Sequence, residues 1–310
     1  MSDTRPWSSV SRRLLDAATT NTYRLGGAAA RYLPATVAAG LVAPFGAGAS
    51  FASAERRAMI ERHLRRADPT LAGLRLRRAT QAAFDSYARY WLESFRLPTL
   101  SARTVADGFT VDGYEHITEG LAAGTGVILV LPHLGGWEWA GRWIADQGHQ
   151  ITVVVERLDP PELFDWFVDL RNELGMNVIP LGGGAAAALM QALRDNHVVC
   201  LLADRDLARN GPEVEFFGEV TTLPAGPAML SLRTGAPILP TAVYFTDRVD
   251  GHHGLVRPPL PAERTAGRLR DDVARVTQEL ARELELLIRR APEQWHMFQP
   301  NWPSDPGYDT

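Results

Sequence analysis

Five short runs of apolar residues, separated by segments with helical periodicity, constrain the fold of this chain most. The runs are VILVL (127–131), ITVVV (151–155), NVIPL (177–181), HVVCLLA (197–203) and PILPTAVYF (237–245). A strand that is apolar at every position is buried on both faces, as in a parallel sheet covered by helices. Between two of these runs, residues 160–175 carry apolar side chains at helical spacing and end at Gly175. The sequence therefore predicts an α/β core with a mostly parallel central sheet flanked by helices.

The first third of the chain has a different pattern, which predicts an α-helical N-terminal membrane-associating extension. We expect a helical region over residues 1–104 and the α/β core over residues 105–310, forming one continuous domain, because no internal repeat or long linker is visible. Residues 32–54 carry no charge and are long enough to cross a bilayer. Pro34, Pro44 and many Ala and Gly residues favour interfacial or buried helices over a membrane span.

Arginines flank this uncharged segment and indicate contact with an anionic membrane surface. The cluster that follows it comprises Arg56, Arg57, Arg62, Arg65, Arg66, Arg75, Arg77 and Arg78. Arginine beside an apolar helix face is typical of proteins that bind anionic lipid. The alternative is a solvated helix face on which the arginines pair with Glu55 and Glu61.

Composition excludes several classes of function. All 32 basic residues are arginine, so Schiff-base chemistry, a pyridoxal-phosphate site and a P-loop are excluded, because each needs a lysine amine. The net charge of -4 argues against a nucleic-acid partner. The single cysteine, Cys200, lies within an apolar run, which predicts a buried thiol and excludes disulfides and zinc–cysteine clusters. The N-terminal stretch MSDTRPWSSVSRRLLD lacks the apolar core of a signal peptide, so we expect an intracellular protein.

Ionisable side chains follow three of the five predicted strands. His133 comes after the run 127–131, Glu156 directly after 151–155, and Asp204 with Arg205 directly after 197–203. The carboxyl ends of parallel strands lie along one edge of a sheet, where open α/β folds bind ligands. The sequence therefore predicts a site at this edge.

The stretch PHLGGWEWAG gives that site a chemistry. His133 is suited to proton transfer near neutral pH, and the carboxylate of Glu138 could orient its ring. Gly135 and Gly136 are expected to leave backbone N–H groups open to an oxyanion at a helix N-terminus. The chain has no G-x-S-x-G nucleophile motif, so His133 is expected to activate a hydroxyl of a substrate. Because H-x4-E also arises by chance, the alternative is a histidine that only caps or packs.

The same stretch resembles the lysophospholipid and late lipid acyltransferase superfamily, in which H-x4-D/E follows a strand. The resemblance continues through VVVERL, RNELGMNVIPL, VVCLLADRDL, VEFFGE, LPAGPAMLSLRTGAPILP and PEQWHMFQP, over roughly residues 80–302. The segments ADRDL, VEFFGE and WHMFQPNW look most like those of phosphatidylinositol mannoside acyltransferases. The resemblance implies transfer of a palmitoyl-type chain from acyl-CoA to a mannose hydroxyl of that glycolipid, with no covalent acyl-enzyme.

The resemblance also implies roles for individual residues. His133 would be the catalytic base, completed by Glu138 within the motif. Asp204 stands where the related enzymes have the glutamate of A-E-R-D-L, which forms a charge relay with the histidine; because aspartate is one methylene shorter, Glu138 is the alternative partner. Arg205 would stabilise the tetrahedral anion.

For substrate binding, the resemblance places Glu156 and Arg171 near the acyl donor, with Arg171 as a clamp on the thioester or a phosphate. The alternative for Arg171 is a surface position on an amphipathic helix. No metal and no cofactor other than acyl-CoA, as co-substrate, is implied.

Other functions remain open from the sequence. The acceptor could be a lipid A-type sugar or a lysophospholipid, and the donor an acyl carrier protein. A thioester hydrolase would use His133 to activate water, and a non-catalytic membrane-binding protein would depend on the N-terminal region alone. We expect a monomer on the cytoplasmic face of the cell membrane, held peripherally or as a monotopic protein.

Overall fold

The computed structural model describes residues 25–157 and 159–308. The helices are α2 (Ala35–Ala52), α3 (Ala54–Ala67), α4 (Gly73–Arg96), α5 (Ala102–Asp107), α6 (Tyr114–Ala122), α7 (Trp137–Asp146), α8 (Pro161–Glu173), α9 (Ala185–Arg194), α10 (Gly226–Thr234) and α11 (Leu269–Arg289), with short 3-10 turns η1 (Leu97–Thr99) and η2 (Pro292–Gln294). The stretch from which an intracellular protein is expected lies outside the described residues.

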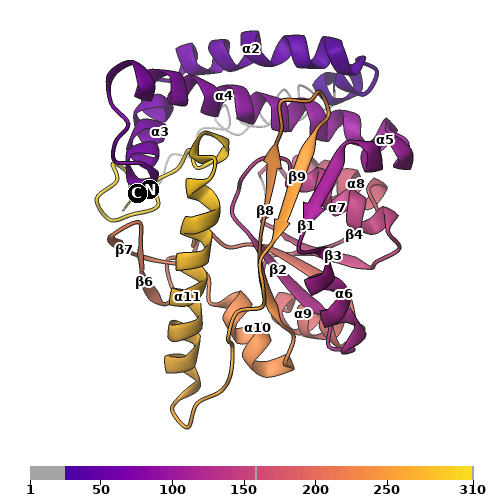
Figure 1. The fold of residues 1–310 in the computed structure, drawn as a ribbon, viewed down its shortest axis with the longest axis vertical. Helices are drawn as coiled ribbons and strands as arrows, with labels where there is room; N and C mark the ends of the chain where they lie inside the picture. Colours follow the sequence, from indigo (N-terminus) through magenta and orange to yellow (C-terminus); the bar gives the residue numbers. More distant parts are fainter. Residues whose placement is uncertain (1–24, 158, 309–310) are drawn as a thin grey trace, which may run out of the picture.

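A seven-stranded sheet forms the centre of the protein, in the order β1-β9-β8-β2-β5-β3-β4 (Figure 1). The strands are β1 (Phe109–Asp112), β2 (Val127–Leu131), β3 (Ile151–Val155), β4 (Met176–Pro180), β5 (Val198–Leu202), β8 (Ile238–Phe245) and β9 (His252–Val256). Strands β8, β2, β5, β3 and β4 run parallel to one another and correspond to the five predicted runs. The predicted α/β fold with a mostly parallel sheet is confirmed.

Alternate side chains of each central strand enter two separate cores, because successive residues of a strand point to opposite faces. On β2, Val127, Leu129 and Leu131 pack with α6 and α7. Ile128 and Val130 pack on the other face with helices α9, α10 and α11. Both faces of the central sheet are therefore shielded from water by helices, which explains why these strands are apolar at every position.

Two parts of the β-structure are not predicted from the sequence. Strand β9 returns antiparallel to β8, and β1 adds beside it, so the sheet is mixed at this edge. A separate hairpin joins β6 (Glu213–Phe216) to β7 (Glu219–Thr222). Its turn places Phe217 and Gly218 at positive φ, the geometry that two-residue hairpin turns require. These strands are short and lie outside the buried centre, so they lack a long apolar run.

The N-terminal helices lie across the top of the molecule, with α2 alongside α4 (Figure 1). Helix α2 is long and apolar enough to cross a membrane by length and composition, yet only 17% of it is buried. Gly46 of α2 lies against Asp85 of α4, where any side chain would collide with the backbone. The opposite face of α2 exposes Val37, Phe45 and Phe51, so α2 is a surface helix and not one of the buried helices allowed by the sequence. The boundary predicted after residue 104 falls within α5.

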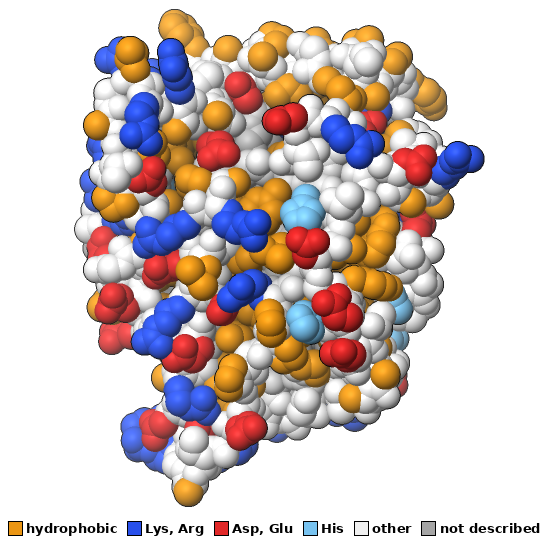
Figure 2. All heavy atoms as spheres, viewed as in Figure 1, with side chains coloured by type: hydrophobic (Ala, Val, Ile, Leu, Met, Phe, Trp, Pro, Cys, Tyr) orange, Lys and Arg blue, Asp and Glu red, His pale blue; other side chains and the backbone are white. Residues whose placement is uncertain are grey.

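Some arginines of the predicted cluster form ion pairs within the protein. Arg62 and Arg66 of α3 pair with Asp305 near the C-terminus, and Arg66 also pairs with Glu219. Glu55 and Glu61 form no ion pair with any described residue, so the predicted i,i+4 pairing does not account for these arginines. Figure 2 shows apolar side chains along α2, with further arginines beside them over α3.

Asp305 ties the C-terminal segment to α3. Its fully buried carboxylate accepts hydrogen bonds from Arg62, Arg66 and His63, and from the backbone N–H groups of Asn301 and Trp302. Burial raises the pKa of Asp305, but the hydrogen bonds from His63, Asn301 and Arg66 outweigh it and hold that pKa well below its usual range. The carboxylate is therefore ionised in the folded protein and binds helix and tail together.

We expect Asp305→Asn to lower the free energy of unfolding by about 3 kcal/mol, because the buried cations lose their counter-charge and the new NH₂ group faces N–H donors. Urea unfolding measures the loss. Asp271→Asn is the matched control: Asp271 is half exposed and pairs with Arg268 at the surface, so its replacement should change the free energy of unfolding far less. Equal effects of the two substitutions would contradict the inference that the Asp305 carboxylate holds the C-terminal segment against α3.

Candidate active site

His133 and Asp204 meet at the carboxyl end of the two central strands β2 and β5. Leu131 of β2 pairs with Leu202 of β5. His133 and Asp204 each lie two residues beyond this pair, so they lie next to each other. His133 Nδ1 lies 2.6 Å from Asp204 Oδ1, and the backbone N–H of His133 donates to Asp204 Oδ2 at 3.0 Å. An ionised carboxylate accepts the Nδ1 proton, which leaves the lone pair of a neutral ring on Nε2.

Asp204 is held as an anion although it is completely buried. Burial raises the pKa of Asp204, but the charge of protonated His133 and the hydrogen bonds from His133 and from the indole N–H of Trp295 outweigh it, so the pKa lies below its usual value. His133 itself is about one-quarter exposed. The pair therefore combines a buried carboxylate with an imidazole that can reach a substrate. Of the two predicted partners for His133, the structure selects Asp204.

Glu138, the acidic residue of H-x4-E, has other partners. It is buried at the start of α7, where Arg171 of α8 forms an ion pair with it and the Tyr90 hydroxyl of α4 donates to it at 3.2 Å. Burial and then the charge of Glu138 raise the pKa of Tyr90 well above its usual value, so the hydroxyl keeps its proton. Glu138 as the orienting partner of His133 is therefore wrong for this structure.

The two arginines predicted to bind substrate each have an acidic partner. Arg171 is largely buried with Glu138, so the alternative of a surface position is wrong, but its guanidinium is engaged and is not a free clamp. Arg205 lies beside Asp204 and contacts Glu156, at the end of β3, at 3.4 Å. Strand order places β3 next to β5, which explains why Glu156 and Arg205 meet. The shared edge predicted for His133, Glu156, Asp204 and Arg205 is thus observed.

Gly135 and Gly136 do not provide the predicted anion hole. The N–H of Gly135 donates to the Gln294 carbonyl at 3.0 Å, and that of Gly136 donates to the Val243 carbonyl at 3.3 Å. Both donors are therefore occupied in this structure, contrary to the prediction. The glycines are needed for close approach instead: a Cβ at Gly135 would overlap the Val243 carbonyl, and one at Gly136 would overlap the ring of His252.

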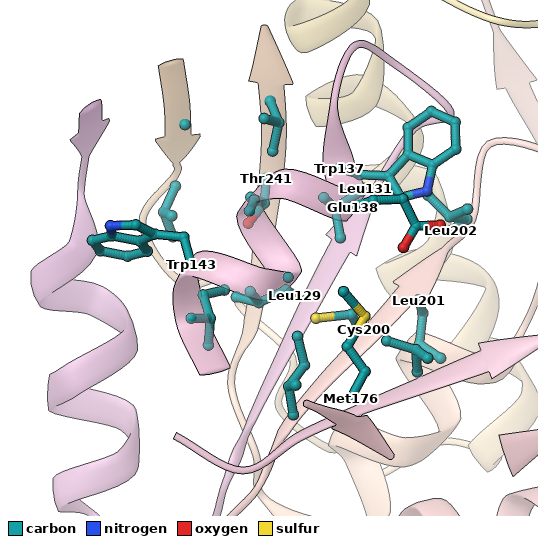
Figure 3. Close-up of a pocket in the computed structure, with 18 of the residues that line it drawn as sticks. Leu129, Leu131, Trp137, Glu138, Trp143, Met176, Cys200, Leu201, Leu202 and Thr241 are labelled. Atoms are coloured by element: carbon teal, nitrogen blue, oxygen red, sulfur yellow. The ribbon is translucent and has the colours of Figure 1, made fainter. Parts of the chain in front are cut away.

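An apolar pocket lies between α7 and the sheet, beside His133 (Figure 3). The empty space between its walls, with the open mouth included, is about 790 Å³. Trp137 and Glu138 lie at one end with Leu131 and Leu202, the last residues of β2 and β5; Trp143 lies at the other end, and Cys200 and Met176 lie between. The ring of Trp137 also meets the ring of His133 edge-on, with centroids 5.7 Å apart. The apolar lining of this pocket therefore begins next to the residue that contacts His133.

Residues near the C-terminus complete the surroundings of His133 and were not assigned a role from the sequence. The backbone N–H of His296 donates to the His133 carbonyl at 2.7 Å, and the indole N–H of Trp295 donates to Asp204. Burial, and then the nearby His133, lower the pKa of His296 to about 3, so its ring is neutral. The motif WHMFQP contained these residues, but their distance from His133 along the chain hid the contact.

Comparison with known proteins agrees with this arrangement. Residues 7–304 match the family described as bacterial lipid A biosynthesis acyltransferase. The chain belongs to this acyltransferase family. The phosphatidylinositol mannoside acyltransferase of Mycobacterium tuberculosis is 45% identical over 229 residues, covering 72% of this chain and 70% of that protein. The protein of the same name from Mycolicibacterium smegmatis is 39% identical over 290 residues, covering 91% of each chain.

Membership of the lipid A biosynthesis acyltransferase family confirms the superfamily resemblance inferred from the motifs. The matched residues include most of the N-terminal helices as well as the sheet. The helical region and the α/β core therefore both belong to the family's pattern.

We expect Arg171→Met to lower the free energy of unfolding by about 3–5 kcal/mol, because Glu138 would remain as an unpaired buried charge. Adding Glu138→Gln should recover part of this loss, since the carboxylate is then removed as well. Urea unfolding of the single and double variants checks both statements. A single variant of unchanged stability, with a raised KM for the acyl donor, would instead favour the donor clamp predicted from the sequence.

Proposed function

We propose that this protein transfers a long acyl chain from acyl-CoA to a mannose hydroxyl of phosphatidylinositol mannoside. Two relatives that cover most of the chain carry the name of that activity. The observation that carries the proposal is the His133–Asp204 pair, whose imidazole is accessible beside an apolar pocket.

In the proposed reaction His133 is a general base. Its Nε2 removes the proton of the acceptor hydroxyl while the hydroxyl oxygen attacks the carbonyl carbon of the thioester. The negative charge of Asp204 stabilises the imidazolium that forms. The tetrahedral intermediate then breaks its carbon–sulfur bond, and the imidazolium returns the proton to the departing coenzyme A thiolate. The enzyme ends the cycle with His133 neutral.

This sequence of steps forms no covalent acyl-enzyme and uses no metal. Cys200 lines the pocket, but burial raises the pKa of its thiol to about 12, so it is not an activated nucleophile. Arg205 is the proposed donor to the tetrahedral anion, since its buried Nε has no partner among the described residues. Because the N–H groups of Gly135 and Gly136 are occupied, this task falls to a side chain.

The apolar pocket is the proposed site of the acyl chain. Its lining comes from α7 and from the central strands, which contribute mostly apolar side chains, among them Leu129 and Leu131 of β2, Leu202 of β5 and Val243 of β8. Glu138 and Arg171 are the charged residues of the lining, and they neutralise each other. An acyl chain in this pocket would bring its thioester close to Trp137 and His133.

We further propose that the protein works on the cytoplasmic face of the cell membrane, held peripherally or as a monotopic protein. The exposed apolar face of α2 supports contact with lipid, and arginines of α3 that are not used inside the protein favour anionic headgroups. Both substrates carry long apolar chains, so a membrane-bound enzyme meets them at high local concentration. The sequence-based expectation of a monomer stays a prediction.

A related acceptor is the second candidate, because the family's own description concerns lipid A biosynthesis. Purified protein is incubated with palmitoyl-CoA and one acceptor in each of three parallel reactions: phosphatidylinositol mannoside, a lipid A precursor or a lysophospholipid. The products are identified by mass spectrometry. The proposal predicts a palmitoylated mannoside. Preference for another acceptor would replace the proposed one, and release of free palmitate with acceptor present would indicate a hydrolase. Vesicle binding without turnover would indicate a non-catalytic membrane protein.

Replacing the base should abolish transfer without unfolding the protein. We expect His133→Ala to lower kcat by about 10²–10⁴-fold, the usual contribution of general-base catalysis. His116→Ala is the matched control, because His116 lies on α6 and its nearest acidic group is Glu119, 3.9 Å away. Initial rates of coenzyme A release measure both. Transfer at the wild-type rate by folded His133→Ala would remove His133 from the mechanism.

Filling the pocket should change the acyl-chain preference. We expect Cys200→Phe to lower kcat/KM for palmitoyl-CoA by about tenfold or more while short-chain acyl-CoA is used at close to the wild-type rate, because the larger ring occupies space between β5 and α7. Cys200→Ala is the control, since it removes the sulfur without adding volume. An equal loss for long and short chains would place the acyl chain outside this pocket.

A further inference from the structure

Asp204 receives a third hydrogen bond that comes from a distant part of the chain. The indole Nε1–H of Trp295, which follows η2, donates to Asp204 Oδ2 at 2.7 Å. The same oxygen accepts the backbone N–H of His133, so the two oxygens have separate tasks: Oδ1 faces the imidazole and Oδ2 faces two fixed donors. A carboxylate held at Oδ2 cannot rotate its Oδ1 away from His133.

Trp295 is well placed to act as a fixed donor. Its side chain is almost fully buried at 4% exposure, in contact with the rings of His63, Phe217 and Trp302. These surroundings fix the ring plane and hence the direction of its N–H. Trp295 does not line the acyl pocket, so it contacts Asp204 and not the proposed substrate.

The segment that carries Trp295 is itself anchored. Asn301 donates from its side-chain amide to the backbone carbonyl of Asp204 at 3.0 Å, and the N–H of Asn301 donates to Asp305. Asp305 is the residue that binds α3. The hydrogen bonds therefore run continuously from α3 through the C-terminal segment to Asp204.

We propose that Trp295 is a positioning residue for acyl transfer, whose indole N–H orients the Asp204 carboxylate that in turn orients His133. This inference rests on the proposed function in taking His133 as the base. The indole N–H is the second donor on Oδ2, and together with the backbone N–H of His133 it holds the carboxylate against the histidine ring.

The groups that surround Asp204 also predict a pH signature. His133 and His296 are the titratable side chains next to it, and His296 stays neutral because its pKa is lowered to about 3. Arg205 is the adjacent residue and remains charged. The hydrogen bond from Trp295 is one cause of the lowered pKa of Asp204, so its removal should raise that pKa. The carboxylate would then be lost at a higher pH as the solution is acidified.

The test compares Trp295→Phe with Trp302→Phe in the full-length protein. Trp302 is a matched control. It is also buried, and the centroid of its ring lies 6.2 Å from that of Trp295, but its indole N–H donates to the carbonyl of Phe216 at 3.0 Å and not to Asp204. We expect W295F to lower kcat roughly 10- to 100-fold, as for loss of one hydrogen bond to a charged group, with KM for palmitoyl-CoA unchanged. The acid-side inflection of kcat belongs to the coupled His133–Asp204 pair, and it should move to higher pH in W295F and stay in place in W302F.

A double-mutant cycle separates positioning from packing. If Trp295 acts through Asp204, W295F should reduce kcat strongly in the wild-type background and by less than about twofold in a D204N background. Equal losses in both backgrounds, or equal losses for W295F and W302F, would overturn the proposal. Thermal unfolding of each variant checks that the compared proteins are folded.

A measurement on the intact indole covers the case in which W295F does not fold. In wild-type protein labelled with ¹⁵N, the assigned indole proton of Trp295 should resonate downfield, as for a bond to a carboxylate, and should move upfield in D204N while that of Trp302 stays in place. An unmoved Trp295 resonance would overturn the inference. Wild-type protein without transferase activity would instead contradict the proposed function, so the two failures are distinguishable.

Discussion

A carboxylate buried at the end of the central sheet is the constraint on which the rest of this structure depends. Asp204 has no exposed surface, so its charge must be met by donors from the protein. Those donors come from His133, in the loop after β2, and from Trp295, which lie far apart in the sequence, and Asn301 donates to the backbone carbonyl of the same aspartate. Holding the anion therefore requires both the strand pairing of β2 with β5 and the docking of the C-terminal segment. His133 and Asp204 are brought together only when the whole fold is assembled.

The two carboxylates near His133 have different physical tasks. Asp204 is neutralised by hydrogen bonds and by a histidine whose charge can change, so it can respond to proton transfer. Glu138 is neutralised by Arg171, whose charge is permanent, and by the Tyr90 hydroxyl. Such a pair ties α7 to α8 and α4 and leaves no unpaired charge at the end of an apolar pocket. Glu138, the acidic residue of H-x4-E, thus stabilises the packing of helices beside the His133–Asp204 pair.

Helix α4 connects the surface of the protein to this site. Its outer side carries α2, the exposed apolar helix, and its inner side contributes Tyr90, which stacks on Trp137 with ring centroids 4.2 Å apart. Trp137 in turn lies between the pocket and His133. A membrane contact at α2 and an acyl chain beside Trp137 would thus be separated by one helix. This arrangement is compatible with the proposed acyl transfer at a membrane surface.

The sequence by itself determined the five buried strands, the helices between them and the edge at which His133, Glu156, Asp204 and Arg205 gather, because apolar runs and strand ends are local patterns. Only the tertiary structure decided which carboxylate serves His133, since that depends on β5 lying beside β2, and strand order is not written in any one segment. It also showed that the N–H groups of Gly135 and Gly136 are occupied, because their acceptors, Gln294 and Val243, lie more than a hundred residues away. Trp295 was hidden for the same reason: a hydrogen bond between distant segments leaves no periodicity in the sequence that could reveal it.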